Sequence, residues 1–161
     1  MNDIVGRLAL AAALACAAHS ALAKTYDVAD FGAKGDGVTK DTAAIQKAID
    51  AAAAAGGGTV ELCAGTFLSG TIWLKSNIDF HLAAGATLKG SPDRADYCKV
   101  DDYVQNHESS RSSENASGGH LVVAVEQSHV TIRGPGRIDG NGLAFCAYPD
   151  GRERNHQRDY E

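Results

Sequence analysis

Proline is scarce in this sequence of 161 residues, which has 3 prolines against 18 glycines. Abundant glycine with little proline is typical of a turn-rich all-β chain and argues against disorder. The length is that of one domain at most. A strong charge of either sign is also missing, since the formal net charge is -5. A mildly acidic chain is a poor partner for nucleic acid or an anionic membrane. An acidic polysaccharide would therefore need a local basic patch.

Paired cysteines with metal-ligand spacing are absent as well. No Cys-x-x-Cys pair occurs, so a zinc cluster is not expected, and no cofactor is implied. Three cysteines follow the first 23 residues: Cys63, Cys98 and Cys146. A bridge between Cys63 and Cys98 would close a loop of a few tens of residues and contribute about 3–4 kcal/mol in the chain-entropy model. Three unpaired, buried thiols are the alternative, and the sequence leaves both open.

No apolar run is long enough to span a bilayer, which takes about 20 residues. The first 23 residues instead have the features of a secretory signal peptide: Arg7 at the flank, a short alanine-rich apolar run over 8–18, and Ala21-Leu22-Ala23 as a small-x-small cleavage pattern. Cleavage between Ala23 and Lys24 would leave 24–161 as the mature domain, with no membrane partner. The alanine-rich leader indicates a bacterial protein that is secreted or periplasmic.

Ligand-binding loops of familiar types are missing too. Lys34-Gly35-Asp36-Gly37 lacks the following Lys-Ser/Thr of a phosphate loop, and is better interpreted as a turn in which Asp36 bonds its own backbone. No acidic cluster has the spacing of a calcium loop. We therefore assign no metal ligands.

One helix is predicted at about 41–55. Asp41 can cap its first turn, and Gly56 can end it. Between them, apolar residues recur at i, i+3, i+4 and i+7, at positions 45, 48, 49 and 52. A single helix ahead of many strands can serve as a lid, because a stack of strands has an open apolar end that needs cover.

From Thr59 onward the apolar residues alternate, and glycines break the chain into short strands. Residues 76–90 are similar to 128–140: each has a strand, then a glycine turn, then a second strand ending in glycine. A repeated strand–turn–strand unit predicts a solenoid. Between the two copies, residues 91–119 are polar and are interpreted as a surface loop. After Gly142 the pattern fades.

Several motifs together resemble the pectin-degrading right-handed β-helix enzymes, and most closely the polygalacturonases of glycoside hydrolase family 28. They lie at residues 30–37, 41–49, 56–60, 74–78, 85–91 and 130–142. The resemblance implies a right-handed parallel β-helix capped by the helix. It also implies a secreted hydrolase of α-linked galacturonan in pectin, with no cofactor, monomeric if full length. Pectic polysaccharide (polygalacturonate) would be its partner.

The catalytic motifs of that family are not found in this sequence. Glycoside hydrolysis needs a carboxylic acid and a second carboxylate. The family carries its aspartates in Asn-Thr-Asp and Asp-Asp elements, followed by His-Gly and Arg-Ile-Lys elements, all on later coils. Because three of these are absent here and the fourth has only a loop candidate, we name no catalytic residue, leave substrate-binding residues unknown, and expect an inactive, poorly soluble N-terminal fragment.

Other residues have simpler structural interpretations. We expect Asp101-Asp102 to be a solvated loop pair, Asp139 to cap a turn and Trp73 to lie in the core. Three histidines in or beside the predicted strands are expected at the coil surface: His81, His120 and His129.

Three further functions stay open. The sequence is compatible with part of a pectate-lyase-like enzyme, for which calcium is common, or of a rhamnogalacturonan-degrading relative. It is also compatible with a non-catalytic β-helix carbohydrate-binding module.

Overall fold

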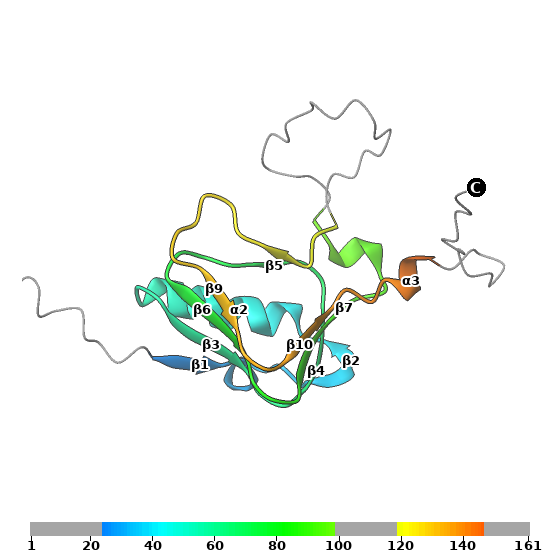
Figure 1. Cartoon of the computed structure of the whole chain (residues 1–161), viewed down its shortest axis with the longest axis horizontal. Helices are drawn as coiled ribbons and strands as arrows, with labels where there is room; N and C mark the ends of the chain where they lie inside the picture. Colours follow the sequence, from blue (N-terminus) through cyan, green and yellow to red (C-terminus); the bar gives the residue numbers. More distant parts are fainter. Residues whose placement is uncertain (1–23, 99–118, 147–161) are drawn as a thin grey trace, which may run out of the picture.

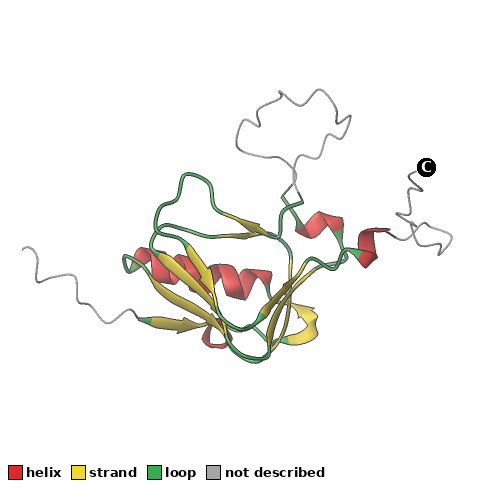
Figure 2. Cartoon of the chain, in the orientation of Figure 1, coloured by secondary structure: helices red, strands yellow, loops and turns green. Residues whose placement is uncertain are grey.

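The computed structural model describes residues 24–98 and 119–146, without the side chains of Phe145 and Cys146. Short strands dominate, with one long helix (Figures 1 and 2). In chain order the elements are β1 (Thr25–Asp27), η2 (Val28–Phe31), β2 (Asp36–Lys40), α2 (Thr42–Ala54), β3 (Gly58–Leu62), β4 (Gly65–Ser69), β5 (Ile72–Trp73), β6 (Ile78–Leu82), β7 (Ala86–Gly90), η3 (Arg94–Asp96), β8 (Val122–Val123), β9 (Thr131–Arg133), β10 (Arg137–Asp139) and α3 (Leu143–Cys146).

The strands form three parallel sheets, which run along the sides of a solenoid. Their orders are β1-β3-β6-β9, β2-β4-β7-β10 and β5-β8. Each full coil adds one strand to each sheet, as β3, β4 and β5 do, and the next coil places β6, β7 and β8 on top of them (Figure 1). This arrangement is a parallel β-helix, as the repeated unit predicted.

The predicted internal repeat is correct to the residue. Phe80 pairs with Ile132 across β6 and β9, and Leu88 pairs with Ile138 across β7 and β10. The two similar segments are therefore successive coils stacked in register. Since strand side chains alternate between faces, in-register stacking places apolar on apolar inside the coil, and Phe80 and Leu88 are fully buried.

The single long helix covers one end of the coils. Its predicted apolar stripe, Ile45, Ala48, Ile49 and Ala52, is completely buried. α2 packs against η2, β1, β3, β5 and β6, and in Figure 1 it lies behind the strands. The prediction of a helical lid is confirmed, and the small alanines let the helix approach closely.

The side chain of Asp41 does not cap the helix as predicted. It makes no capping hydrogen bond, and Thr42 begins the helix. The carboxylate of Asp41, only 1% exposed, instead accepts hydrogen bonds from the backbone N–H groups of Lys34 (2.7 Å) and Gly35 (3.0 Å). It thus fixes the tight turn before β2 onto the start of α2. The turn itself is as predicted, since the Asp36 carboxylate accepts from the N–H groups of Val38 and Thr39.

Replacement of Asp41 by alanine should destabilise the fold. The variant leaves two N–H groups without their acceptor in a buried site, and a hydrogen bond to a charged group is worth about 1.5–3 kcal/mol. We expect urea unfolding of residues 24–161 to show a loss of that order, with Asp41→Asn intermediate. Asp36→Ala is the matched control, because it removes two similar backbone bonds, and one from the Thr39 hydroxyl, at an exposed turn where water replaces them. An equal loss for both alanine variants would contradict this role.

Candidate functional site

Polar side chains on the outer face of the β3-β6-β9 sheet contact one another across neighbouring coils. Arg133 binds Asp79 through Nε (2.8 and 2.9 Å) and Nη2 (2.6 Å), and the hydroxyl of Thr59 also donates to Asp79 at 3.1 Å. In the adjacent row Nδ1 of His81 lies 3.2 Å from the carboxylate of Glu61. The Arg133 guanidinium lowers the pKa of Asp79. These side chains join neighbouring coils to each other.

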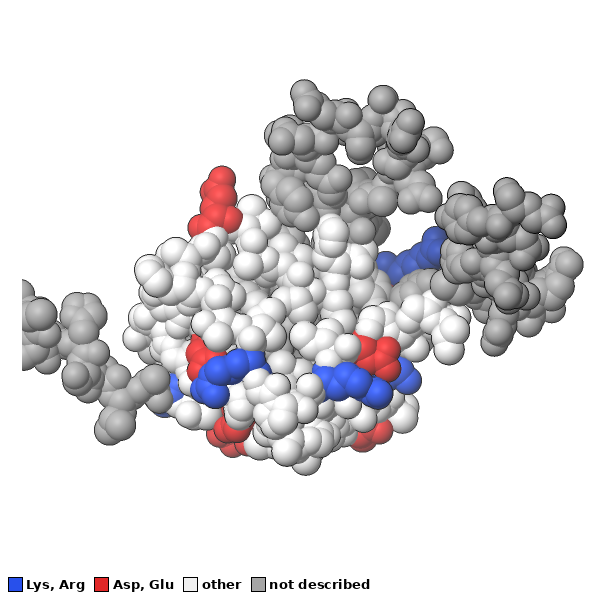
Figure 3. Space-filling view, viewed as in Figure 1, with Lys and Arg blue, Asp and Glu red and all other residues white. Residues whose placement is uncertain are grey.

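The described residues on the side of the molecule drawn in Figure 3 offer no continuous basic surface for an acidic polymer. Figure 3 shows basic and acidic side chains next to one another in small groups, separated by uncharged surface. The pairing in the structure explains this pattern, because Arg133 is paired with Asp79, and Arg137 lies 3.6 Å from Asp139. The local basic patch that an acidic polysaccharide needs is therefore not seen on the described residues in this view.

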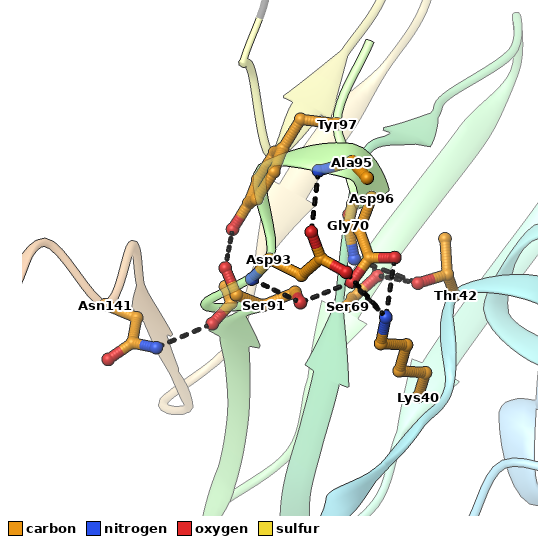
Figure 4. A network of polar contacts seen from close by, with 11 residues as sticks. Lys40, Thr42, Ser69, Gly70, Ser91, Asp93, Ala95, Asp96, Tyr97 and Asn141 are labelled. Carbon is orange, nitrogen blue, oxygen red and sulfur yellow. Dashed lines mark hydrogen bonds and ion pairs between the residues drawn. The ribbon is translucent and has the colours of Figure 1, made fainter. Parts of the chain in front are cut away.

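A second polar network surrounds the end of β7 (Figure 4). Nζ of Lys40, from β2, lies 2.8 Å from the carboxylate of Asp96 and 3.4 Å from that of Asp93. The hydroxyl of Ser91 donates to Asp96 and accepts from the N–H of Asp93. The buried hydroxyl of Tyr97 donates to the carbonyl of Ser91 at 2.8 Å. The network fixes η3 between the ends of β2 and β7.

One hydroxyl joins the two ends of the polar insertion. The Oγ1 of Thr71 accepts from the N–H of Cys98 (2.9 Å) and donates to the carbonyl of His120 (2.6 Å), while Gly119 N–H donates to the Cys98 carbonyl at 2.9 Å. The chain therefore leaves the coil and rejoins it at one point. Sequence reasoning located the insertion but missed Thr71, since no local signal links residue 71 to residues 98 and 120.

Four of the described carboxylates have the electrostatics of scaffold groups. A general acid for glycoside hydrolysis needs a raised pKa. These four groups have a lowered pKa instead, because a hydrogen bond or a cation stabilises the charged form; they are Asp36, Asp50, Asp79 and Asp96. Among residues 24–98 and 119–146, no three His, Cys, Asp or Glu side chains gather as a metal site.

The candidates named from sequence are spread over the coils. Asp139 accepts from the Asn141 N–H at 2.9 Å and so caps a turn, as predicted. His81 lies on the outer face of β6, and His129 takes a positive φ of 56° in the turn before β9. Asp101 and Asp102 lie outside the described residues. The structure thus brings none of the described candidates together into a site.

The placement of Trp73 in the core was wrong. Ile72 and Leu74 are buried, so strand alternation turns the indole of Trp73 outward, where it is half-buried. Gln46 of α2 instead holds the backbone of this residue, by accepting from its N–H at 2.8 Å and donating to its carbonyl at 3.1 Å.

Cys63 and Cys98 are free thiols, so the bridge considered between them is not formed. Cys63 follows β3 and lies beside the end of β1, where its thiol donates to the carboxylate of Asp27 at 3.1 Å. That carboxylate raises the pKa of the Cys63 thiol to about 11. Cys98 lies at the base of the insertion, near the start of β5. The thiols thus occupy different corners of the coil. The side chain of Cys146 lies outside the described residues.

The Lys40–Asp96 pair should make stability sensitive to acid. Hydrogen bonds from Lys40 and Ser91 lower the pKa of Asp96 below its ordinary value of 3.8. A lowered carboxyl pKa stabilises the fold above the unfolded pKa, and this stabilisation is lost as pH falls through the folded pKa. We therefore expect the unfolding free energy to fall less steeply below about pH 4 in Asp96→Asn than in the unmodified chain. Equal slopes in Asp96→Asn and in the unmodified chain would contradict the assignment.

Comparison with known proteins gives consistent matches. Residues 25–135 match the family described as rhamnogalacturonase A/epimerase, pectate lyase-like. The exo-poly-α-D-galacturonosidase of Dickeya chrysanthemi is 40% identical over 126 residues, which is 76% of this chain and 20% of that protein. The mannuronan C5-epimerase AlgE5 of Azotobacter vinelandii is 57% identical over 61 residues, which is 33% of this chain and 6% of that protein.

A solved structure agrees with these matches. The family 28 exopolygalacturonase of Yersinia enterocolitica superposes with a TM-score of 0.61 at 36% identity, and covers 74% of this chain and 21% of that one. The chain thus spans about a fifth of the length of the galacturonan-cleaving relatives. The resemblance to glycoside hydrolase family 28 is confirmed. The chain therefore belongs to the rhamnogalacturonase A/epimerase, pectate lyase-like family and has the right-handed parallel β-helix of these enzymes.

Proposed function

We propose that this chain forms the N-terminal coils of an exported glycoside hydrolase that cleaves α-linked galacturonan in pectin. The observation that carries the proposal is the 40% identity to an exo-poly-α-D-galacturonosidase over 76% of the chain, which is far more than the opening motif. The Arg133–Asp79 pair holds neighbouring coils together, the Lys40–Asp96 pair holds η3 to β2, and the pKa values of Asp79 and Asp96 are lowered. The described coils therefore act as a scaffold, on which catalytic residues from elsewhere in the enzyme are mounted.

A second candidate, a uronan epimerase or lyase, rests on a different match. The identity to the mannuronan C5-epimerase is higher, at 57%, but it covers only 33% of the chain. A short match of this kind is what a shared capping helix and first coil would give. Hydrolysis of galacturonan is favoured because its match covers 76% of the chain. The family match over residues 25–135 is described as rhamnogalacturonase A/epimerase, pectate lyase-like, so a rhamnogalacturonan-degrading or pectate-lyase-like enzyme is a third candidate. A binding module is less favoured, because the relatives named above are enzymes.

A graft separates these functions. Residues 25–135 would replace the matching segment of the Dickeya chrysanthemi galacturonosidase, and the matching 61 residues would replace those of the epimerase. We expect the first chimera to release reducing sugar from polygalacturonate at a tenth or more of the parent rate, because its catalytic coils then rest on a compatible scaffold. Activity of the epimerase chimera alone would reverse the assignment.

Residues 24–161 alone serve as the control and should release no reducing sugar from polygalacturonate. Release that Asp102→Asn abolishes would contradict the proposal, because it would mean that a compact catalytic site lies in the insertion.

We also propose that export removes residues 1–23. The first sheet contact supports this boundary, because the carbonyl of Lys24 accepts from the N–H of Thr59 at 3.0 Å and the Lys24 ammonium lies 4.9 Å from the centre of the Tyr26 ring. Cleavage after Ala23 would therefore leave these contacts with β3 and β1 intact. No helix among the described residues is long and apolar enough to span a bilayer.

Expression in a Gram-negative host tests the boundary. The periplasmic protein should begin at Lys24 by N-terminal sequencing, and Ala23→Asp should accumulate the 161-residue precursor, since the cleavage pattern needs a small residue there. Ala12→Ser in the apolar run is the control and should be processed normally. A cytoplasmic product that retains Met1 would overturn this proposal.

A further inference from the structure

The third sheet, β5-β8, has an edge that no described strand pairs with. β1 pairs with β3 and β2 pairs with β4, but β5 pairs only with β8. The N–H groups of Ile72 and Leu74 donate toward β8, to the carbonyls of Leu121 (2.9 Å) and Val123 (2.7 Å). Successive residues of a strand direct their backbone groups to opposite sides, so the N–H and C=O of Trp73 face the other edge. This edge has one donor and one acceptor to satisfy.

The helix α2 lies where a further strand of this sheet would otherwise be. Every residue between β2 and β3 is described, and the chain there forms α2 in place of a strand. The side-chain carbonyl of Gln46 accepts from the Trp73 N–H at 2.8 Å, and its NH2 group donates to the Trp73 carbonyl at 3.1 Å. A neighbouring strand would satisfy the same two groups. A single amide side chain can do so because it carries both an acceptor and a donor.

Two more polar side chains of α2 extend this contact along the chain on both sides of β5. The hydroxyl of Thr42 accepts from the N–H of Gly70 at 2.9 Å, and the carboxylate of Asp50 lies 2.8 Å from Nζ of Lys75. Thr42, Gln46 and Asp50 are four positions apart, so they lie on one face of the helix. We call these three residues the polar stripe. Their partners follow in the same chain order, so α2 and β5 run side by side in the same direction.

We propose that α2 replaces a strand of the third sheet, and that the amide of Gln46 makes this replacement possible. A helix can cover a strand edge, but its own backbone groups are bonded within the helix and cannot pair with that edge. The N–H and C=O of Trp73 would then be shielded from water without partners, which costs more free energy than their hydrogen bonds contribute. Gln46 supplies both partners, so the helix closes the sheet at this edge. The proposal does not depend on the hydrolase assignment.

Amide hydrogen exchange in uniformly 15N-labelled residues 24–161 tests this edge one residue at a time. In Gln46→Ala the N–H of Trp73 loses its acceptor, and we expect it to exchange about tenfold faster or more, because this edge then opens locally. The N–H groups of Ile72 and Leu74 are an internal control on the same strand. Since they bond to β8, their exchange rates should stay within about threefold of those in the unmodified chain.

A second variant separates pairing from packing. Gln46→Leu keeps a side chain of similar size on α2, so it would preserve stability if Gln46 only filled space. Under the proposal it covers the N–H and C=O of Trp73 without pairing them, whereas Gln46→Ala lets water reach them. We therefore expect Gln46→Leu to unfold at a lower urea concentration than Gln46→Ala. Lys47→Leu, at the exposed neighbouring position, is the matched control and should unfold with the unmodified chain.

Three results would overturn the proposal. The first is an unchanged exchange rate for the Trp73 N–H in Gln46→Ala, and the second is equal acceleration at residues 72, 73 and 74. The third is a Gln46→Leu variant at least as stable as Gln46→Ala.

Discussion

In-register stacking of parallel strands is the constraint on which this structure depends. Tyr26, Val60, Phe80 and Ile132 lie one above another along the inner face of one sheet. Each apolar side chain is covered only if the next coil repeats the same alternation, and burial of a large aliphatic or aromatic side chain is worth about 1.5–3 kcal/mol. A shift of one residue would turn every apolar group outward, so the register is fixed by the inward row.

The capping helix follows from the same constraint. The first coil has no described coil beneath it, so its inner side chains need a cover that brings no unpaired strand edge. α2 provides this with a buried stripe of two isoleucines and two alanines, whose backbone hydrogen bonds are satisfied within the helix. The turn that leads into α2 is held by the buried carboxylate of Asp41. Lid and first coil are thus joined by a polar contact as well as by apolar packing.

Features with a short period could be predicted from the sequence. The stripe of α2, the Asp36 turn and the register of the repeat all depend on spacings within a helix, a turn or a strand, and all three are found in the structure. Errors arose where competing neighbours or a distant residue decide the outcome. Trp73 faces outward because its neighbours Ile72 and Leu74 take the inner positions on a strand of two residues. Thr71 was overlooked because its partners are 27 and 49 positions away.

The fold was easier to infer than the activity, because the fold depends on short, repeated spacings in the sequence and the activity does not. The rows that define the coil, apolar inside and paired charges outside, are requirements of stacking and hold for any chemistry that a β-helix supports. The pairing of Asp79 with Arg133 links adjacent coils and lowers the carboxyl pKa, which suits a structural carboxylate and opposes a role as general acid. Ionisable residues used to join coils are therefore poor candidates for catalysis. A catalytic site on this scaffold would have to be built from carboxylates that lie outside these cross-coil pairs.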